Sequence, residues 1–493
     1  LIGTIFPNYF FFSVCKHFLE DIIRLYYDKL ELITKGKKMN ITSSIFREND
    51  IRGTYPEQIN ENTIKLVAYA IARKCKKHEI NSIAVGRDGR LSGPSLLESF
   101  CDGLLEAGIH VNNIGLVTSP LLYFAAKKEE SKSGIMITGS HNPKNHNGIK
   151  MVIDDKPVSG TEIFDLIRNS EDFGKKGEIK YTDIKELYLE EVSKNISVQK
   201  PEELKIVLDS GNGAAECIAP DLFKALGFSV IELFSEVDGN FPNHHPDPGK
   251  LENLKDLIAE VEKSNADVGF AFDGDGDRVG LVTNKGEVIF PDKLMMLFSK
   301  DILSRDKGKI VFDVKCSNQL ENLITEQGGI PIMSPTGHFH IKKAIKKNNA
   351  LLGGEMSGHI FFNDKWYGFD DGHYAAVRIA EILTNSDKNI SELINQFPQS
   401  FSTPELNITV TDETKFSVIE DFEKNCNLDG EKITIDGLRV NFKDGWGLLR
   451  ASNTTPKLVL RFEGDSSESM TRFQEEFISE LSRICPNIDI NLD

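Results

Sequence analysis

Short apolar runs, each followed by a helical stretch, recur along most of the chain. Three of them are SIAVGRD at 82–88, KIVLDSG at 205–211 and KIVFDVK at 309–315. They are rich in Ile and Val and end in polar turns, which predicts buried strands. Each leads into a helical pattern that ends near a glycine, and that glycine starts a second apolar run, in EAGIHV, ALGFSV and EQGGIPI.

After another helical stretch, each unit has a third apolar run that ends in a polar, glycine-rich loop. These runs are GIMITGSHNP, VGFAFDGDGD and ALLGGEMSGH. A β-α-β-α-β pattern repeated three times predicts α/β layers with largely parallel sheets. Ligands bind beyond the carboxyl ends of such strands, so we expect the three loops to converge on one cleft.

From about residue 403 the pattern changes to alternating segments and a final amphipathic helix. The segments are ELNITV, KITIDGLRVNF, GWGLLRAS and KLVLRFEG, and the helix is expected around 468–484. We therefore predict three similar α/β domains with mixed, largely parallel sheets and a smaller C-terminal α+β domain, around a central cleft. The expected boundaries are 39–187, 188–286, 287–402 and 403–493.

The first 38 residues do not share this pattern. Their apolar stretch LIGTIFPNYFFFSVC is interrupted by Pro7 and Asn8 and is too short to span a bilayer. It also lacks a basic segment and a small-residue cleavage site. We expect 1–38 to be an N-terminal extension outside the fold, with an added helix or a targeting segment as the alternatives.

The net charge and the cysteine pattern argue against several classes of protein. The net charge of −17 argues against binding to nucleic acid or to a membrane surface, and means that an anionic substrate needs local positive charge. Seven scattered cysteines without a CxxC pair exclude a disulfide scaffold or zinc knuckle, and indicate a reducing, cytoplasmic location. The sequence gives no indication of the oligomeric state.

The first loop, TGSHNP at 138–143, contains a candidate nucleophile. Ser140 follows a glycine at a strand end, where we expect its hydroxyl to be exposed. His141 and, further along, Lys150 supply positive charge that can stabilise a phosphate. A turn with a capping serine would explain part of this run but not all of it.

The second loop, DGDGDR at 273–278, is a candidate metal site. Asp273, Asp275 and Asp277 follow an apolar strand at alternate positions, and oxygen ligands of this kind suit Mg²⁺. An EF-hand is excluded, because Arg278 and Asn284 stand where it needs Gly and Glu. A haloacid dehalogenase phosphotransferase, with Asp275 as nucleophile, fits the aspartates but leaves the other loops without a role.

The third loop, GGEMSGH at 353–359, offers a carboxylate and a hydroxyl. Glu355 and Ser357 are two residues apart, and so lie on one side of an extended loop, where they could bind neighbouring sugar hydroxyls. Taken alone, this segment is equally consistent with a structural turn.

The fourth loop, RASNTTP at 450–456, has the composition of a phosphate cradle. An arginine, several hydroxyls and the backbone N–H groups of a turn bind phosphate well, and Arg461 could support them. The residues concerned are Arg450, Ser452, Asn453 and Thr454. A hairpin turn with polar side chains is the alternative.

Together the four loops resemble the α-D-phosphohexomutase family, over roughly residues 45–490. GEMSGH is similar to the sugar loop of the bacterial phosphomannomutase/phosphoglucomutase branch and differs from the GEQSGH of phosphoglucosamine mutases. The segment FRENDIRG at 46–53 resembles the family's N-terminal motif, with Asn49 in place of a frequent tyrosine. His146 replaces another tyrosine in the serine loop.

The resemblance implies a hexose 1-phosphate/6-phosphate mutase acting on mannose and glucose through a phosphoserine and a hexose 1,6-bisphosphate, which also serves as activator. It implies that Ser140 carries the phosphoryl group and that one Mg²⁺ binds Asp273, Asp275, Asp277 and a phosphoserine oxygen. The implied catalytic residues are Lys150, as general acid or base, His141, Arg52, Arg278 and His338. The implied substrate-binding residues are Lys315, Glu355, Ser357, His359, Arg450, Ser452, Asn453, Thr454 and Arg461. A phosphatase or a silent sugar-phosphate binder remains the alternative.

Overall fold

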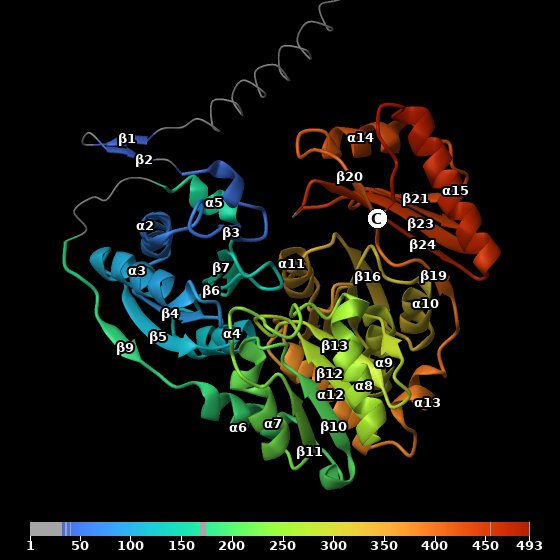
Figure 1. Cartoon of the computed structure of the whole chain (residues 1–493), viewed down its shortest axis with the longest axis horizontal. Coiled ribbons are helices and arrows are strands. Elements are labelled where there is room, and N and C mark those ends of the chain that lie inside the picture. Colours follow the sequence, from blue (N-terminus) through green and yellow to red (C-terminus); the bar gives the residue numbers. More distant parts are fainter. Residues whose placement is uncertain (1–31, 35–36, 40, 168–173, 454, 493) are drawn as a thin grey trace, which may run out of the picture.

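The computed structural model describes residues 32–34, 37–39, 41–167, 174–453 and 455–492 (Figure 1). The expected extension, 1–38, lies mostly outside the described residues. Near its end, strands β1 (Leu32–Thr34) and β2 (Lys37–Met39) pair with each other in antiparallel fashion. Among the described residues, no helix is long and apolar enough to cross a membrane.

The first α/β unit is built on a sheet with the order β3-β7-β6-β4-β5-β9. Strands β4, β5, β6 and β9 are parallel, whereas β7 runs antiparallel to β6 and to β3. The strands are β3 (Ile51–Thr54), β4 (Ser82–Arg87), β5 (His110–Leu116), β6 (Gly134–Ile137), β7 (His146–Ile153), β8 (Lys156–Pro157) and β9 (Ile179–Tyr181), and the helices are α2 (Glu61–Lys77), α3 (Gly93–Glu106), α4 (Ser119–Lys128) and α5 (Gly160–Phe164).

The next two units repeat the central part of this arrangement. In each of the three sheets the first strand lies between the second and the third, parallel to both, and a fourth strand is antiparallel to the third. The predicted threefold repeat is therefore confirmed. The second unit has strands β10 (Lys205–Asp209), β11 (Ser229–Leu233), β12 (Val268–Phe272), β13 (Val279–Thr283) and β14 (Val288–Ile289), with helices α6 (Lys185–Asn195), α7 (Ala219–Ala225) and α8 (Lys255–Ser264).

The third unit has the smallest of the three sheets, flanked by the longest series of helices. Its strands are β15 (Lys309–Asp313), β16 (Ile330–Ser334), β17 (Leu352–Gly354) and β18 (Ile360–Phe362), and its helices are α9 (Pro291–Arg305), α10 (Asn318–Glu326), α11 (His338–Asn348), α12 (Gly372–Thr384) and α13 (Ile390–Ile394). Figure 1 shows α11 facing the first unit across the centre of the molecule.

The C-terminal unit is an antiparallel sheet covered by two helices, as expected for a small α+β domain. Segment 432–442 forms two strands, because the chain reverses at Gly437, which has a φ of +73°. Helix α15 (Ser467–Ile484) agrees with the predicted helix, whereas α14 (Lys415–Asn425) was not predicted. The strands are β19 (Phe401–Ser402), β20 (Leu406–Thr409), β21 (Glu431–Ile433), β22 (Leu438–Phe442), β23 (Gly445–Ala451) and β24 (Lys457–Gly464).

The hydrophobic core is divided unequally between these units. One continuous cluster runs from Leu121 on α4 through Phe270 on β12 to Trp366 beyond β18, whereas most of the first unit's core, around Phe100 on α3, is a separate cluster. The C-terminal unit has a core of its own around Phe473 and Phe477. Burial of large apolar side chains is the main stabilising term in folding, so the second and third units depend most on each other, and the first is joined to them through its α4 side.

Candidate active site

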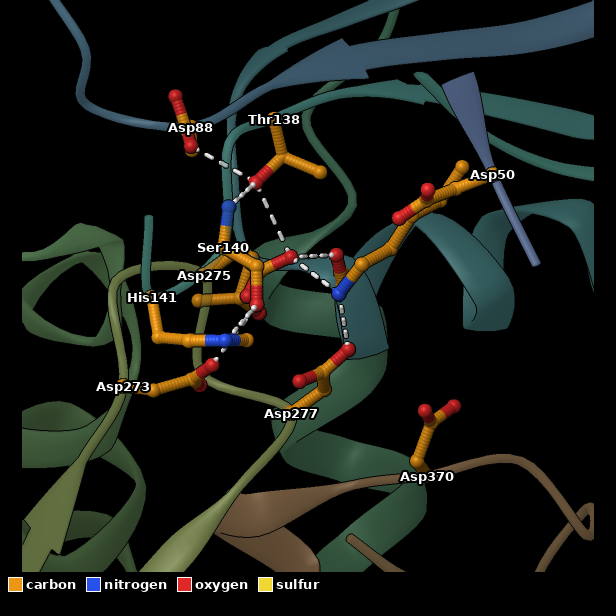
Figure 2. A network of polar contacts seen from close by, with 12 residues as sticks. Asp50, Asp88, Thr138, Ser140, His141, Asp273, Asp275, Asp277 and Asp370 are labelled. Carbon is orange, nitrogen blue, oxygen red and sulfur yellow. Dashed lines mark hydrogen bonds and ion pairs between the residues drawn. The ribbon is translucent and has the colours of Figure 1, made fainter. Parts of the chain in front are cut away.

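Loops that follow the third strands of the first two α/β units meet at one place, with Asp370 of the third unit beside them (Figure 2). Ser140 Oγ, after β6, lies 3.1 Å from Asp273 Oδ2, after β12. Lys150 Nζ on β7 lies 2.7 Å from Asp275 Oδ2 and 2.5 Å from Asp277 Oδ2. Hydrogen bonds and ion pairs therefore link the loops of the first two units, which are far apart in sequence, at the carboxyl ends of their sheets.

The backbone at Ser140 is tightly constrained. Ser140 has a φ of +50°, its N–H donates to Thr138 Oγ1 at 2.8 Å, and its Oγ lies 3.2 Å from His141 Nδ1. A Cβ on Gly274 would lie only 2.5 Å from the carbonyl oxygen of Ser140, so the two loops meet closely because residue 274 has no side chain. The expectation of an exposed hydroxyl is wrong: Ser140 is 1% exposed, because the second unit's loop covers it.

Arg90 and Asp88 hold the serine loop in shape, and the sequence analysis did not identify them. Arg90 donates to the carbonyl oxygens of Ser140 (2.7 Å), Asn142 (2.6 Å), Pro143 (2.6 Å) and His146 (2.8 Å). Asp88 Oδ2 accepts from Thr138 Oγ1 at 2.7 Å and from the N–H of Gly139 at 3.1 Å. The polar turn DGR after the first buried strand was the available signal.

The three aspartates of the second loop form a buried group that suits a cation. One oxygen from each lies within 4.8 Å of the others. Burial and the repulsion of the neighbouring carboxylates raise the pKa of Asp273 and Asp277. The Oδ1 atoms of Asp275 and Asp277 are buried and form no hydrogen bond with any described residue. A carboxylate group with unsatisfied oxygens is compatible with a bound metal ion.

Lys150 and His141 are cationic candidates in different electrostatic environments. Burial would lower the pKa of Lys150, but Asp275 and Asp277 outweigh that effect and raise it. Burial, together with Arg278 and Arg52, holds the pKa of His141 well below its usual value. Lys150 is therefore a charged donor at neutral pH and His141 a neutral imidazole.

The two arginines of the predicted site are both held by hydrogen bonds. Arg52 on β3 donates to Asn142 Oδ1 at 3.1 Å and to Asp50 Oδ2 at 2.5 Å. Arg278 Nε donates to His359 Nε2 at 3.0 Å, which joins the second unit to the third. Because an arginine N–H is always a donor, His359 Nε2 must be the acceptor, and its ring proton is on Nδ1.

Asp370 was not identified from the sequence, although it lies at the base of the third loop. The Nδ1 of His359 faces Asp370 Oδ2 at 3.1 Å, and Lys342 Nζ on α11 lies 2.6 Å from Asp370 Oδ1. His338, at the start of α11, is 4.0 Å from the same carboxylate. Its pKa is well below the usual value because of burial and the charge of Lys342.

The third loop, 353–359, which resembles the family's sugar loop and is called the sugar loop below, has a carboxylate oxygen without a hydrogen-bond donor among the described residues. One carboxylate oxygen of Glu355 accepts from the N–H of Gly337, whereas Oε2 is buried and accepts no hydrogen bond from the described residues. Ser357, two residues on, is half-buried. An acceptor that is buried but unsatisfied is costly unless a ligand donates to it.

The fourth loop lies in the C-terminal unit beside Lys315 of the third. Arg450 Nε donates to Asp436 Oδ2 at 2.9 Å, and the same oxygen accepts from the N–H of Thr336 at 2.9 Å. Ser452 Oγ accepts from the N–H of Thr455, and Asn453 is half-buried. Thr454 lies outside the described residues.

Lys315 and Arg461 lie together at the junction of the third and C-terminal units. Lys315 forms an ion pair with Glu405. Arg461 Nη1 donates to the carbonyl oxygen of Lys315 at 2.5 Å, and Nη2 lies 3.3 Å from Asp292. Arg461 is buried, so its guanidinium fixes the backbone at Lys315.

Four family models together match nearly the whole chain. They are those of the phosphoglucomutase/phosphomannomutase alpha/beta/alpha domains I (43–172), II (186–286) and III (290–401) and of the C-terminal domain (405–480). The chain belongs to the phosphoglucomutase/phosphomannomutase family, which confirms the resemblance found in the sequence.

The matches to individual relatives extend over almost the full length of each relative. A phosphomannomutase/phosphoglucomutase from Pseudomonas syringae pv. tomato is 50% identical over 455 residues, covering 91% of this chain and 97% of the relative. A phosphoglucomutase from Neisseria gonorrhoeae is 48% identical, covering 89% and 96%. A crystal structure of a phosphoglucomutase/phosphomannomutase family protein from Burkholderia thailandensis has a TM-score of 0.86 at 41% identity, covering 92% of this chain and 100% of that one.

Proposed function

We propose that this chain is a phosphohexomutase that interconverts the 1- and 6-phosphates of mannose and glucose, with Ser140 as the phosphoryl carrier. Relatives at about half identity bear the names of both activities. The observation that carries the mechanism is the position of Ser140 Oγ, buried and 3.1 Å from Asp273 Oδ2, with Lys150 close by.

In the proposed reaction, the phosphate of phospho-Ser140 is transferred to the free hydroxyl of a hexose phosphate. A new P–O bond to the sugar forms as the bond to Ser140 Oγ breaks, and the proton that the sugar hydroxyl gives up is gained overall by Ser140 Oγ, which becomes a hydroxyl again. The resulting hexose 1,6-bisphosphate turns over, and its other phosphate returns to Ser140. Phosphoryl transfer depends on positioning and charge stabilisation, which Arg52, Lys150 and Arg278 supply here.

Mg²⁺ is the ion we propose for Asp273, Asp275 and Asp277. The unsatisfied Oδ1 atoms of Asp275 and Asp277 and the repulsion among the three carboxylates fit a small, hard cation, with a phosphoserine oxygen as a further ligand. When bound, the ion supplies neutralising charge for the transferred phosphoryl group. Hexose 1,6-bisphosphate is the proposed activator, because it phosphorylates Ser140.

Two further groups hold the substrate in either orientation. The open Oε2 of Glu355 accepts from sugar hydroxyls, with Ser357 beside it, and His359, whose ring nitrogens face Arg278 and Asp370, supports them. The phosphate that does not react binds at the fourth loop, whose proposed ligands are Lys315, Arg450, Ser452, Asn453 and Thr454, with Arg461 in support. His338 and His141 complete the proposed set beside the reacting phosphate. The burial of Ser140 limits hydrolysis, which favours a mutase over a phosphatase.

A paired assay tests this proposal. Purified protein with Mg²⁺ and a bisphosphate activator is given mannose 1-phosphate, glucose 1-phosphate or glucosamine 1-phosphate, and both the 6-phosphate and free phosphate are measured. We expect 6-phosphate from the first two and little free phosphate. Release of free phosphate on every turnover would identify a phosphatase instead.

We also propose a cytoplasmic location. The six described cysteines are all free thiols, as is usual in a reducing compartment. Hexose phosphates are the proposed partners, and the net charge of −17 argues against nucleic acid.

A further inference from the structure

A cavity of about 660 Å³ lies between the first and third units, apart from the catalytic loops. Strands β7 and β8 line one side, and helix α11 with the segment before Asp370 lines the other. Of the site residues described above, only Lys342 contributes to its wall. Its volume is within the range of small-molecule binding sites.

The wall of this cavity is basic, although the chain as a whole is strongly acidic. Eight lysines line it, against two carboxylates, Asp155 and Glu162. The lysines come from both sides of the cavity and are Lys74, Lys127, Lys132, Lys156, Lys342, Lys343, Lys346 and Lys347. So many like charges around one concave surface repel one another, and an anion placed between them lowers that energy.

Carboxylates pair with five of the eight lysines: Lys74 with Glu162, Lys156 with Asp154, Lys342 with Asp370, and both Lys127 and Lys346 with Asp155. Asp155 is shared by Lys127, at 2.5 Å, and Lys346, at 3.0 Å, which joins the two units across the cavity. Within the described chain, Lys132, Lys343 and Lys347 form no ion pair with a carboxylate. Basic residues in the last turn of a helix are stabilising, which accounts for Lys346 and Lys347 on α11 but not for Lys343 or for Lys132, in the loop before β6.

The remaining wall is apolar, so the cavity has two kinds of surface. Met151, Ile153, Val158, Ile345 and Phe369 contribute to it. A ligand that fits has several negative charges for the lysines and a less polar body for this wall. Phosphate esters with two or more phosphates, such as nucleoside triphosphates, combine these properties, whereas a single hexose phosphate has too few charges.

We propose that this cavity is a second anion site that binds an organic polyphosphate and thereby holds the first and third units together. It is separate from the site of the mutase reaction and does not depend on the substrate proposed for it. One residue of the cavity wall contacts the catalytic side, because Lys342 Nζ lies 2.6 Å from Asp370, which in turn faces His359.

Binding of inorganic tripolyphosphate and of ATP to the full chain, measured by titration calorimetry without divalent metal, tests the proposal. The test variant replaces Lys343, Lys346 and Lys347 with Gln, which removes exposed charges without creating a cavity. The matched control replaces Lys194, Lys263 and Lys424, exposed lysines on other helices, with Gln. A third variant, Arg450→Ala, tests whether the probes bind at the fourth loop instead of in the cavity.

We expect wild type, the matched control and Arg450→Ala to bind both probes alike, and the α11 variant to bind them at least about tenfold more weakly. Basal mutase activity of the α11 variant should stay within about twofold of wild type. The proposal would be overturned if the α11 variant bound the probes as tightly as wild type, or if the matched control lost as much affinity as the α11 variant. It would also be overturned if Arg450→Ala lost affinity instead, or if the protein bound tripolyphosphate but not ATP.

Chemical labelling of wild-type protein keeps the test valid if the α11 variant does not fold. Acetylation of individual lysines, followed by mass spectrometry with and without ATP, should show at least about threefold slower labelling of Lys132, Lys346 and Lys347, with Lys263 unchanged. If ATP changed the labelling rates of all four lysines equally, or changed none of them, the proposed site would be contradicted.

Discussion

The serine loop (138–143) and the sugar loop (353–359) follow corresponding strands in two copies of one repeat, but they differ in how completely their polar groups are hydrogen-bonded. In the serine loop, Arg90 alone donates to four backbone carbonyls, and Ser140 is enclosed. In the sugar loop, Glu355 has one oxygen satisfied and one left open. With the roles proposed above, the comparison teaches that the reacting atom is fixed before substrate arrives, while the hydrogen bonding of the recognition group is left for the substrate to complete.

The largest effect should come from removing the proposed phosphoryl carrier. Ser140→Ala should lower kcat by about 10⁴-fold, with some residual activity through direct exchange with bisphosphate. Intact-mass analysis of wild type should show a phosphate adduct that maps to 134–150. Ser133→Ala, at the other end of β6, is the control. Near-normal turnover by Ser140→Ala would remove the basis of the comparison.

The next largest effect concerns the aspartates beneath the serine loop. Asp275→Ala, or excess chelator with wild type, should lower turnover by about 10³-fold, because neutralising charge near the phosphoryl group is worth several kcal/mol. Circular dichroism should show an intact fold, and added Mg²⁺ should restore only the chelated wild type. Full activity in chelator would contradict the metal requirement.

A substitution at Arg90, which holds the serine loop but is not a proposed substrate ligand, tests whether the rigidity of that loop contributes to turnover. Arg90→Lys keeps the charge but not the four hydrogen bonds, and misplacement of Ser140 by about 1 Å should lower kcat by about 10²-fold with little change in KM. Arg87→Lys, which alters one neighbouring backbone hydrogen bond, is the matched control. If kcat and KM changed together, or only the Tm fell, Arg90 would not act as a positioning residue.

On the recognition side, Glu355→Ala should lower kcat/KM by about 10–100-fold for mannose 1-phosphate and glucose 1-phosphate in parallel. In the resembled branch Glu355 and Ser357 bind hydroxyls that the two sugars share, and galactose 1-phosphate should be rejected more strongly. Glu326→Ala on the exposed face of α10 is the control. A loss confined to one sugar, or a wild-type mannose-to-glucose ratio beyond about 10³, would show that another group distinguishes them.

The smallest effect should come from a carboxylate outside both loops. Burial and the neighbouring Glu232 raise the pKa of Glu216 to about 7. Its neutral form favours the folded state below about pH 4, and this stability is lost as the pH rises through 7. Glu216→Gln should therefore raise the Tm at pH 8 by about 1–2 °C and leave it unchanged at pH 4, by calorimetry. An equal shift at both pH values would rule out titration as the cause.

Whether sequence alone could find a residue depended on how local its signal was. Ser140 and the three aspartates stand in short runs, and the strands before them have the apolar pattern of buried β-structure, so both were predicted. Arg90 acts on carbonyls 50 or more residues away, and Asp370 acts through His359 and Lys342, so neither has a pattern of its own. Burial of Ser140 was also missed, since the covering loop belongs to another unit.

Secondary structure followed the same rule. The buried strands of the three repeats were predicted because their apolar runs are continuous. Helix α14 was missed, because only a few apolar residues, among them Val418, Ile419 and Phe422, mark its buried face. Segment 432–442 reverses at Gly437 within an unbroken alternation, so the pattern alone gave no sign of the hairpin.

The unequal division of the hydrophobic core has a consequence for how the enzyme fails under heat. The second and third units share one cluster, which continues into the α4 side of the first unit, and these three should melt as one block although the first also has a cluster of its own; the C-terminal unit has its own core and can melt on its own. A molecule in that partly melted state keeps Ser140 beside the aspartates but has lost Arg450 and the loop around it. Isomerisation should therefore stop at a lower temperature than the one at which the catalytic block unfolds, and cooling should restore it.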